Sequence, residues 1–226
     1  MTSNNHFIHT PVKIIYSCFC ITIICLLAFG DNLSYAANPA ESNGYDEVLV
    51  SDQATVFSSP FNGKDLTGWG YRNKSQEKIV FESFDDKNTS TDGRFIGKEG
   101  ILTVNPWIEA NGPHLISLWT KQEYSGDFSL SIEFRASVNA DSGIYLRGKQ
   151  LQCRDYLVAG PYKELKKYKP QDWNLIEVIV KDNIAHCTCN GEVLEEALIL
   201  PVSGPFGLEA DRGRMEYRNI QIRELK

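Results

Sequence analysis

The stretch Phe128-Ser-Leu-Ser-Ile-Glu-Phe-Arg135 decides the fold of this chain, because apolar and polar residues alternate along it without a break. In an extended strand, successive side chains point to opposite faces. One face therefore carries Phe128, Leu130, Ile132 and Phe134, and the other carries only polar residues. Such a pattern predicts a β-strand with one face in a core and the other in solvent.

Shorter patterns of the same kind follow on the C-terminal side. Residues 142–147 place Ile144 and Leu146 opposite Tyr145 and Arg147, and residues 173–181 place Ile176, Val178 and Val180 on one face. Asn190-Gly191 predicts a tight hairpin between strands at 185–189 and 193–194. Two further strands are expected at 206–210 and 215–222, separated by a turn at 211–213.

Helical periodicity is weak throughout this region. The charged segment Lys163–Lys169 ends at Pro170, so we interpret it as a loop. Many short strands joined by turns are typical of an all-β protein with two packed sheets. The sequence therefore predicts a single antiparallel β-sandwich domain over residues 57–226.

The first 36 residues have the order of features of a secretory signal peptide. A polar segment with one lysine, Lys13, precedes the apolar run Ile14–Gly30, and Ser34-Tyr35-Ala36 supplies small residues at a cleavage site. A transmembrane anchor is the alternative, although the run is near the lower length limit for a span. A lipoprotein is disfavoured because Ile24 precedes Cys25 where a small residue is needed. We expect cleavage after Ala36, a flexible spacer at 37–56, and a periplasmic or secreted chain without a stable membrane anchor after signal cleavage.

Composition narrows the class of partner and the role of the cysteines. The net charge is −6, which argues against nucleic acid, because phosphate binding needs a basic surface. Signal cleavage leaves Cys153, Cys187 and Cys189, an odd number that requires at least one free thiol or an intermolecular bond. Cys187 and Cys189 alternate along a predicted strand, so we expect core packing in preference to a metal site.

Several segments, taken in order, resemble the 3-keto-disaccharide hydrolase family, formerly a domain of unknown function. The segment Phe61-Asn-Gly-Lys-Asp-Leu-Thr-Gly-Trp69 is similar to the opening signature of that family. Asp141-Ser-Gly-Ile-Tyr-Leu-Arg147 resembles its "NSGI-x-x-R" segment, with Asp in place of the usual Asn. The resemblance continues through most of the predicted domain, in the segments Asp127–Arg135, Leu151–Asp155, Gly160–Tyr162, Trp173-Asn174, Asn190-Gly191, Gly207–Asp211 and Tyr217–Ile220.

The resemblance implies a concanavalin A-like, jelly-roll sandwich and the cleavage of glycosides that carry a ketone at C3. The chain departs from the family pattern at Glu209, where Gln is usual, and at Leu151, where an acid is common. Both departures touch the candidate site.

The chemistry implied by the resemblance suggests roles for individual residues. A 3-keto group acidifies the hydrogen at C2, so such an enzyme needs a general base and a group that stabilises the enolate. The matching segments offer Asp155, Glu209 or Asp211 as the base and Arg147 as the group that binds the enolate or a sugar oxygen. Polar strand faces and the neighbouring loop add candidate substrate-binding residues: Glu133, Tyr145, Gln152 and Tyr162. The carboxylates could instead hold a divalent metal ion that polarises the ketone.

Structural roles compete with several of these assignments. Glu133 and Arg135 fit a solvated strand face equally well, and Arg147 with Asp155 fits a structural salt bridge. For Trp173 we expect core packing, while Trp119 could stack on sugar. At the level of function, the alternative to an enzyme is a non-catalytic carbohydrate-binding module on the same fold, and a surface scaffold is the third possibility.

Overall fold

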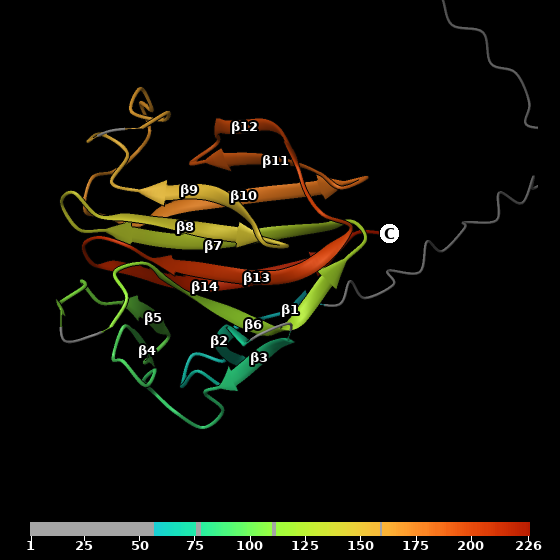
Figure 1. The fold of residues 1–226 in the computed structure, drawn as a ribbon. Coiled ribbons are helices and arrows are strands. Elements are labelled where there is room, and N and C mark those ends of the chain that lie inside the picture. Colours follow the sequence, from blue (N-terminus) through green and yellow to red (C-terminus); the bar gives the residue numbers. More distant parts are fainter. Residues whose placement is uncertain (1–56, 76–77, 110–111, 159) are drawn as a thin grey trace, which may run out of the picture. The chain divides into compact units, whose positions relative to one another are not determined.

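The computed structural model describes residues 57–75, 78–109, 112–158 and 160–226, and these residues form two antiparallel β-sheets that pack face to face (Figure 1). The predicted signal peptide at 1–36 and the predicted spacer at 37–56 lie outside the described residues. Within the described part of the chain, no helix has the length and apolar character needed to cross a membrane.

We call the larger sheet sheet A and the smaller one sheet B. Sheet A has the order β12-β11-β10-β7-β14-β5-β4, with β1 paired to β14, and its strands are β1 (Phe57–Ser58), β4 (Phe95–Lys98), β5 (Ile101–Val104), β7 (Phe128–Ala136), β10 (Asn174–Lys181), β11 (Ile184–Cys189), β12 (Glu192–Ile199) and β14 (Met215–Glu224). Sheet B has the order β3-β2-β6-β13-β8-β9, and its strands are β2 (Trp69–Ser75), β3 (Lys78–Ser83), β6 (Ile116–Ser125), β8 (Asp141–Leu146), β9 (Lys149–Arg154) and β13 (Ser203–Ala210).

The alternating stretch that decides the fold forms β7, near the centre of sheet A. Its burial alternates at every residue, as the sequence pattern predicts. Strand β10 pairs with it in register, so Ile176 lies opposite Ile132 and Val178 opposite Leu130. The hairpin at Asn190-Gly191 is also confirmed, because both residues have the positive φ that this type of tight turn requires, 50° and 76°. The all-β sandwich predicted from the sequence is therefore confirmed.

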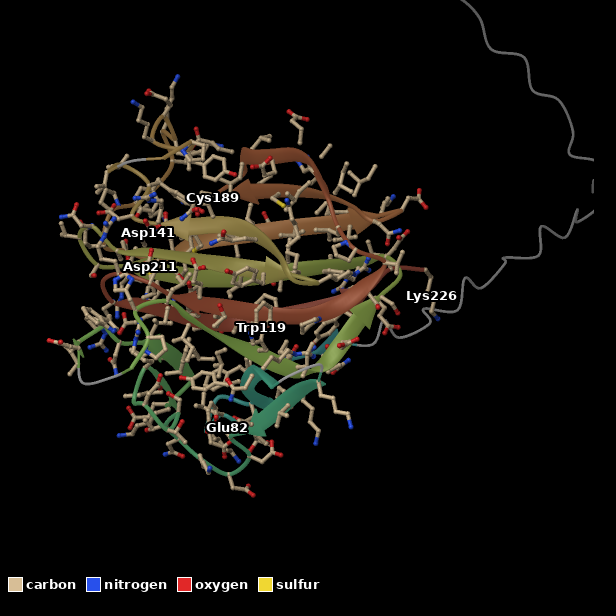
Figure 2. The ribbon with its side chains drawn as sticks, in the orientation of Figure 1. Glu82, Trp119, Asp141, Cys189, Asp211 and Lys226 are labelled. Atoms are coloured by element: carbon tan, nitrogen blue, oxygen red, sulfur yellow. The ribbon has the colours of Figure 1, made fainter. Side chains whose placement is uncertain are left out.

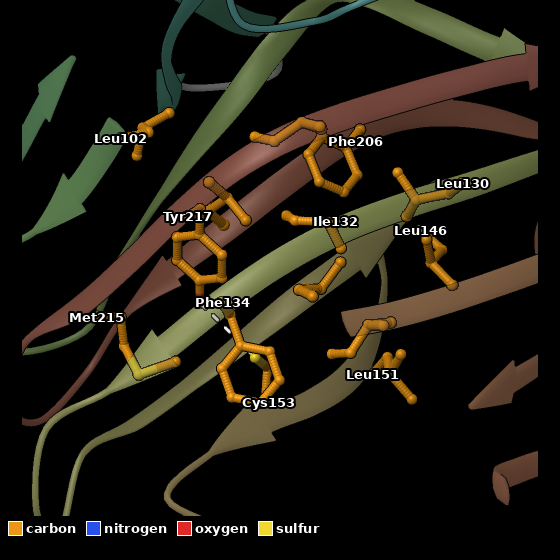
Figure 3. Packing of buried hydrophobic residues seen from close by; sticks show 14 of the residues in the cluster. Leu102, Leu130, Ile132, Phe134, Leu146, Leu151, Cys153, Phe206, Met215 and Tyr217 are labelled. Carbon is orange, nitrogen blue, oxygen red and sulfur yellow. Dashed lines mark hydrogen bonds between the residues drawn. The ribbon is translucent and has the colours of Figure 1, made fainter. Parts of the chain in front are cut away.

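The core fills the space between the sheets and contains the three cysteines that follow the predicted signal. Figure 3 shows Phe134 and Tyr217 of sheet A beside Cys153 of sheet B. Cys153, Cys187 and Cys189 are free thiols with no exposed surface. Burial raises the pKa of Cys187 and of Cys189 to about 12, so both behave as small apolar residues.

Candidate functional site

The outward-facing side of sheet B gathers polar and aromatic side chains from four neighbouring strands. The strand β13 buries Phe206, Leu208 and Ala210 in the core, so Gly207 and Glu209 face outward. Gly207 lies opposite Trp119 of β6 on one side and opposite Tyr145 of β8 on the other. We call this surface, with Ser117, Trp119, Gly143, Tyr145, Gln150, Gln152, Gly207 and Glu209, the sheet B face.

Glu209 is the carboxylate at the centre of the sheet B face, and only 5% of its surface is exposed. The Tyr145 hydroxyl donates a hydrogen bond to Oε1 at 2.7 Å, and Gln150 Nε2 donates one to Oε2 at 2.7 Å. Burial raises the pKa of Glu209, and the negative charges of Asp211 and Asp141 raise it further, against the hydrogen bonds from Tyr145 and Gln150, which lower it. A raised pKa is characteristic of a carboxyl group that exchanges protons in catalysis.

Two glycines give the neighbouring side chains room to lie flat against the sheet. A Cβ at Gly207 would stand 2.5 Å from Cε3 of Trp119, so the indole ring covers that glycine. A Cβ at Gly143 would stand 2.5 Å from Nε2 of Gln150, so this side chain crosses Gly143 on its way to Glu209. Larger residues at either position would displace a neighbour of the carboxylate.

Trp119 and Tyr145 form a partly exposed aromatic pair beside Glu209. Their ring centroids are 4.8 Å apart and the ring planes are tilted by 41°. Figure 2 shows Trp119 on the outer side of sheet B, away from the core. An exposed aromatic surface next to hydrogen-bonding groups suits an apolar sugar face with its hydroxyl rim. Burial and the hydrogen bond to Glu209 raise the pKa of Tyr145 to about 12, so its hydroxyl keeps its proton and donates.

The backbone of Glu209 is also held from the core side. Ser142 on β8 faces inward and donates from Oγ to the Glu209 carbonyl at 2.6 Å. The same Oγ lies 2.8 Å from the hydroxyl of Tyr217, which reaches across from sheet A. The strand that carries the carboxylate is therefore fixed to both sheets.

A second acidic group lies at the end of the sheet B face, and its charge is already balanced. Asp141 contacts Arg154 at 3.3 Å and Arg212 at 3.4 Å, and it accepts a hydrogen bond from Gln152 Nε2 at 2.7 Å. The predicted substrate-binding residue Gln152 thus lies on the correct face but is occupied by Asp141.

Asp211 lies at the same end, two residues after Glu209, and it contacts a histidine. Its Oδ1 is 3.3 Å from Nδ1 of His114, whose ring meets the edge of Trp107 with centroids 5.1 Å apart. Figure 2 shows Asp141 and Asp211 close together at this end of sheet B. The structure therefore brings Glu209, Asp211, Tyr145 and Gln152 of the sequence-predicted residues onto one surface.

Arg147 is not part of this surface, contrary to the strand pattern that placed it beside Tyr145. The strand β8 ends at Leu146, and Arg147 takes a φ of 52° in the turn to β9. Its side chain is 3% exposed and donates to Asn183 Oδ1 at 2.8 Å, to the Pro201 carbonyl at 3.1 Å and to the Gly126 carbonyl. The salt bridge considered between Arg147 and Asp155 is wrong, because β8 separates their ends of the sandwich by about 20 Å.

Asp155 serves the loop that follows β9. Its carboxylate accepts hydrogen bonds from the Asn139 amide at 3.0 Å, the Tyr168 hydroxyl at 3.2 Å and Gln171 Nε2 at 3.3 Å. It is 3% exposed. These contacts make it a structural residue that joins two loops.

The remaining sequence-predicted residues lie on other surfaces. Glu133 is on the outer side of sheet A, where Arg218 Nε contacts it at 2.5 Å. Tyr162 packs on Tyr156 and donates to Glu195, beside β12. The expectation of core packing for Trp173 is wrong, since its ring is partly exposed and lies under the guanidinium groups of Arg135 and Arg218, 4.7 Å and 3.9 Å from them.

Sequence reasoning missed several residues that shape the sheet B face, among them Ser117, Gln150, Trp107, His114 and Arg94. Strand parity could have found Ser117, which shares the face of Trp119 two residues away. His114 and Arg94 carry no such signal, because their contacts with Asp211 join distant parts of the chain. Among the described residues, no group of three or more His, Cys, Asp or Glu side chains is placed to hold a metal ion.

Comparisons with known proteins agree with this architecture. A solved structure described as a glycosyl hydrolase from Parabacteroides distasonis is 17% identical and has a TM-score of 0.54, over 75% of this chain and 94% of that one. A second such protein from the same organism is 18% identical, with a TM-score of 0.46 over 70% of this chain and 99% of that one. A carbohydrate-binding module from Bacillus subtilis is 9% identical, with a TM-score of 0.42 over 71% of this chain and 98% of that one. At these identities the first likeness shows the shared fold alone, and the other two carry no argument. A search of curated protein sequences finds no match.

The family comparison is more specific, and it covers the whole sandwich. Residues 56–223 match the model of the 3-keto-alpha-glucoside-1,2-lyase-like domain. The matched region contains both sheets, apart from the last residue of β14, and every residue of the sheet B face. The chain therefore belongs to the 3-keto-disaccharide hydrolase family.

Proposed function

We propose that this chain is an exported enzyme that cleaves 3-keto-glycosides or 3-keto-disaccharides by elimination, with Glu209 as the base that removes the proton at C2. Family membership makes it a carbohydrate-active domain of the glycosyl hydrolase type. The observation that supports the finer proposal is the environment of Glu209: a buried carboxyl group with a raised pKa, beside a partly exposed aromatic pair.

The chemistry follows from the ketone. Glu209 takes the C2 proton, and the electron pair of that C–H bond is delocalised onto the C3 oxygen as an enolate. The C1–O1 bond then breaks, a C1–C2 double bond forms, and the leaving oxygen takes up a proton. Addition of water across the double bond completes a net hydrolysis. A single carboxylate is enough for the first step, unlike the paired carboxylates of an ordinary glycosidase.

The neighbouring residues have supporting roles in this proposal. Trp119 stacks on the sugar ring, and Tyr145 and Gln150 hold the two oxygens of Glu209 so that one lone pair can point at C2. Arg147 and Asp155 take no part, because the two terminal guanidinium nitrogens of Arg147 and the carboxylate of Asp155 are engaged in structural contacts.

A carbohydrate-binding module is the second candidate. The exposed pair of Trp119 and Tyr145 favours it, since a module needs a stacking ring and hydrogen bonds but no base. The two functions differ in one respect, which is whether the bound sugar is released as product.

The test uses purified residues 37–226 with 3-keto-trehalose and 3-keto-glucosides, with and without EDTA. An enzyme releases sugar, and a loss of release with EDTA would add a metal ion to the mechanism. Measurable binding of the same ligands in calorimetry, with no release of sugar, would instead support the carbohydrate-binding module.

Mass spectrometry of the exported chain should find Ala37 at the N-terminus, and a retained Met1 on a membrane-bound chain would contradict export.

A further inference from the structure

His114 is the one histidine that the structure places beside the sheet B face. It lies two residues before β6, and the pairing of Ala210 with Ile116 brings it alongside Asp211, which directly follows β13. Its ring is 52% exposed, and Nδ1 is turned toward Oδ1 of Asp211 at 3.3 Å. The other ring nitrogen, Nε2, is therefore the one that a ligand can reach.

Asp211 directly follows β13 and is two residues from Glu209, so in an extended chain both side chains point to the same side. Their Cα atoms are about 7 Å apart, and the charge of Asp211 contributes to the raised pKa of Glu209. Glu209, Asp211 and the His114 ring therefore follow one another at this end of the sheet B face. A sugar ring laid between the two groups would present C2 to Glu209 and the leaving oxygen to His114.

The position of His114 is fixed by a buried arginine. Arg94 has no exposed surface, and its guanidinium donates to the carbonyl oxygens of Asn105, Pro113, His114 and Asp211 at 3.0–3.3 Å. Asn105, Pro113 and His114 belong to the segment before β6, and Asp211 follows the end of β13, so the arginine joins the two. The histidine and its aspartate partner are therefore held together by the backbone as well as by their side chains.

We propose that His114, oriented by Asp211, is the general acid that protonates the leaving oxygen of the substrate. This role rests on the proposed function. As the C1–O1 bond breaks, the bonding pair goes to O1, and the Nε2 proton of the imidazolium passes to O1. Glu209 has gained the C2 proton and His114 has lost one, so the next turnover requires Glu209 to release a proton and His114 to take one up from water. The contact between Nδ1 and Asp211 holds the ring in place.

A leaving group that needs no proton separates this role from a structural one. We compare 3-keto-trehalose with 4-nitrophenyl 3-keto-glucoside, which loses a stable phenolate. For His114→Gln, kcat/KM on 3-keto-trehalose should fall by about 10²-fold or more, whereas the value for the nitrophenyl substrate should change by no more than about fivefold. The control is His186→Gln, a half-buried histidine on β11 of sheet A, which should change neither value.

The result that overturns the proposal is an equal loss on both substrates, or no loss on either. His114→Ala with a matched thermal unfolding curve guards against a folding artefact in the Gln variant. Failure of the proposed function looks different, because the wild-type chain would then release no product from either substrate. Glu209→Gln provides the remaining contrast, since loss of the base should lower both rates together.

Discussion

At the scale of single residues, the pKa of Glu209 is set by its burial and by neighbours on two other strands, β8 and β9, together with Asp211 just after its own strand. Tyr145 of β8 and Gln150 of β9 stabilise the ionised form, while burial and the carboxylates of Asp211 and Asp141 oppose it. Burial and the neighbouring carboxylates have the larger effect, so the pKa of Glu209 is raised. A base must be ionised to act, so activity should be lost on the acid side at a higher pH than an unperturbed glutamate would give.

The acid limb of the pH profile of kcat/KM should therefore move in opposite directions in two variants. Tyr145→Phe removes a hydrogen bond to the ionised carboxylate, so the pKa of Glu209 rises and the limb moves to higher pH. Asp211→Asn removes a repelling charge, so the pKa falls and the limb moves to lower pH. Both profiles are measured with 4-nitrophenyl 3-keto-glucoside, because its leaving group needs no proton from His114. Glu177→Gln on sheet A should leave the limb in place, and parallel shifts in both variants would contradict the assignment of the base.

At the scale of elements, the sheet B face depends on a loop anchor that lies outside both sheets. Arg94 connects the segment that carries Trp107 and His114 to the end of β13 through backbone carbonyls alone. A buried carbonyl oxygen that loses its hydrogen-bond donor lowers the free energy of unfolding, because neither water nor another donor takes the place of the lost one. This anchor makes the end of the face rigid.

Arg94→Met should lower the free energy of unfolding by about 2–4 kcal/mol. It should also reduce kcat/KM for 3-keto-trehalose more than for the nitrophenyl substrate, because His114 loses its position. The control is Arg72→Met, which removes an ion pair with the half-exposed Glu123 and should cost no more than about 1 kcal/mol. Urea denaturation and kinetics on the two substrates measure both effects. A destabilised variant in which kcat/KM falls equally on the two substrates would show that Arg94 has only a structural role.

Local patterns predicted the elements better than the site, and particular residues show why. Strict alternation identified β7, and the Asn-Gly pair identified the hairpin between β11 and β12, because both depend on neighbouring residues only. Arg147 was misplaced because the strand ends one residue earlier, in a turn with positive φ. Glu133 was assigned to the site because alternation identifies a polar face but cannot say which sheet carries it.

At the scale of the whole molecule, the sandwich isolates its three thiols from solvent. Cys153, Cys187 and Cys189 have no exposed surface, and burial raises the pKa of each thiol. The thiolate is the reactive form of cysteine, so both accessibility and ionisation protect these residues. Burial would therefore keep these thiols free in the oxidising compartment that the proposed export implies.

The native mature chain should not react with a thiol reagent such as 5,5′-dithiobis(2-nitrobenzoic acid) at pH 8, and three thiols should appear in denaturant. A fast-reacting thiol in the folded protein would contradict the packing. Cys187→Ala with Cys189→Ala should lower the free energy of unfolding while leaving kcat/KM on 3-keto-glycosides and the metal content unchanged. A stoichiometric metal lost in that double variant would show that the two residues are ligands.

The most direct measurement of the central claim is single-turnover cleavage of a 3-keto-glycoside by the wild type and by Glu209→Gln. The amide keeps the size of the side chain and one oxygen that can accept a hydrogen bond from Tyr145 or Gln150, but it cannot accept the C2 proton. If Glu209 is the base, the rate should fall by about 10²-fold or more, with the dissociation constant of the ligand nearly unchanged. A Glu209→Gln variant that cleaves at the wild-type rate would contradict that role.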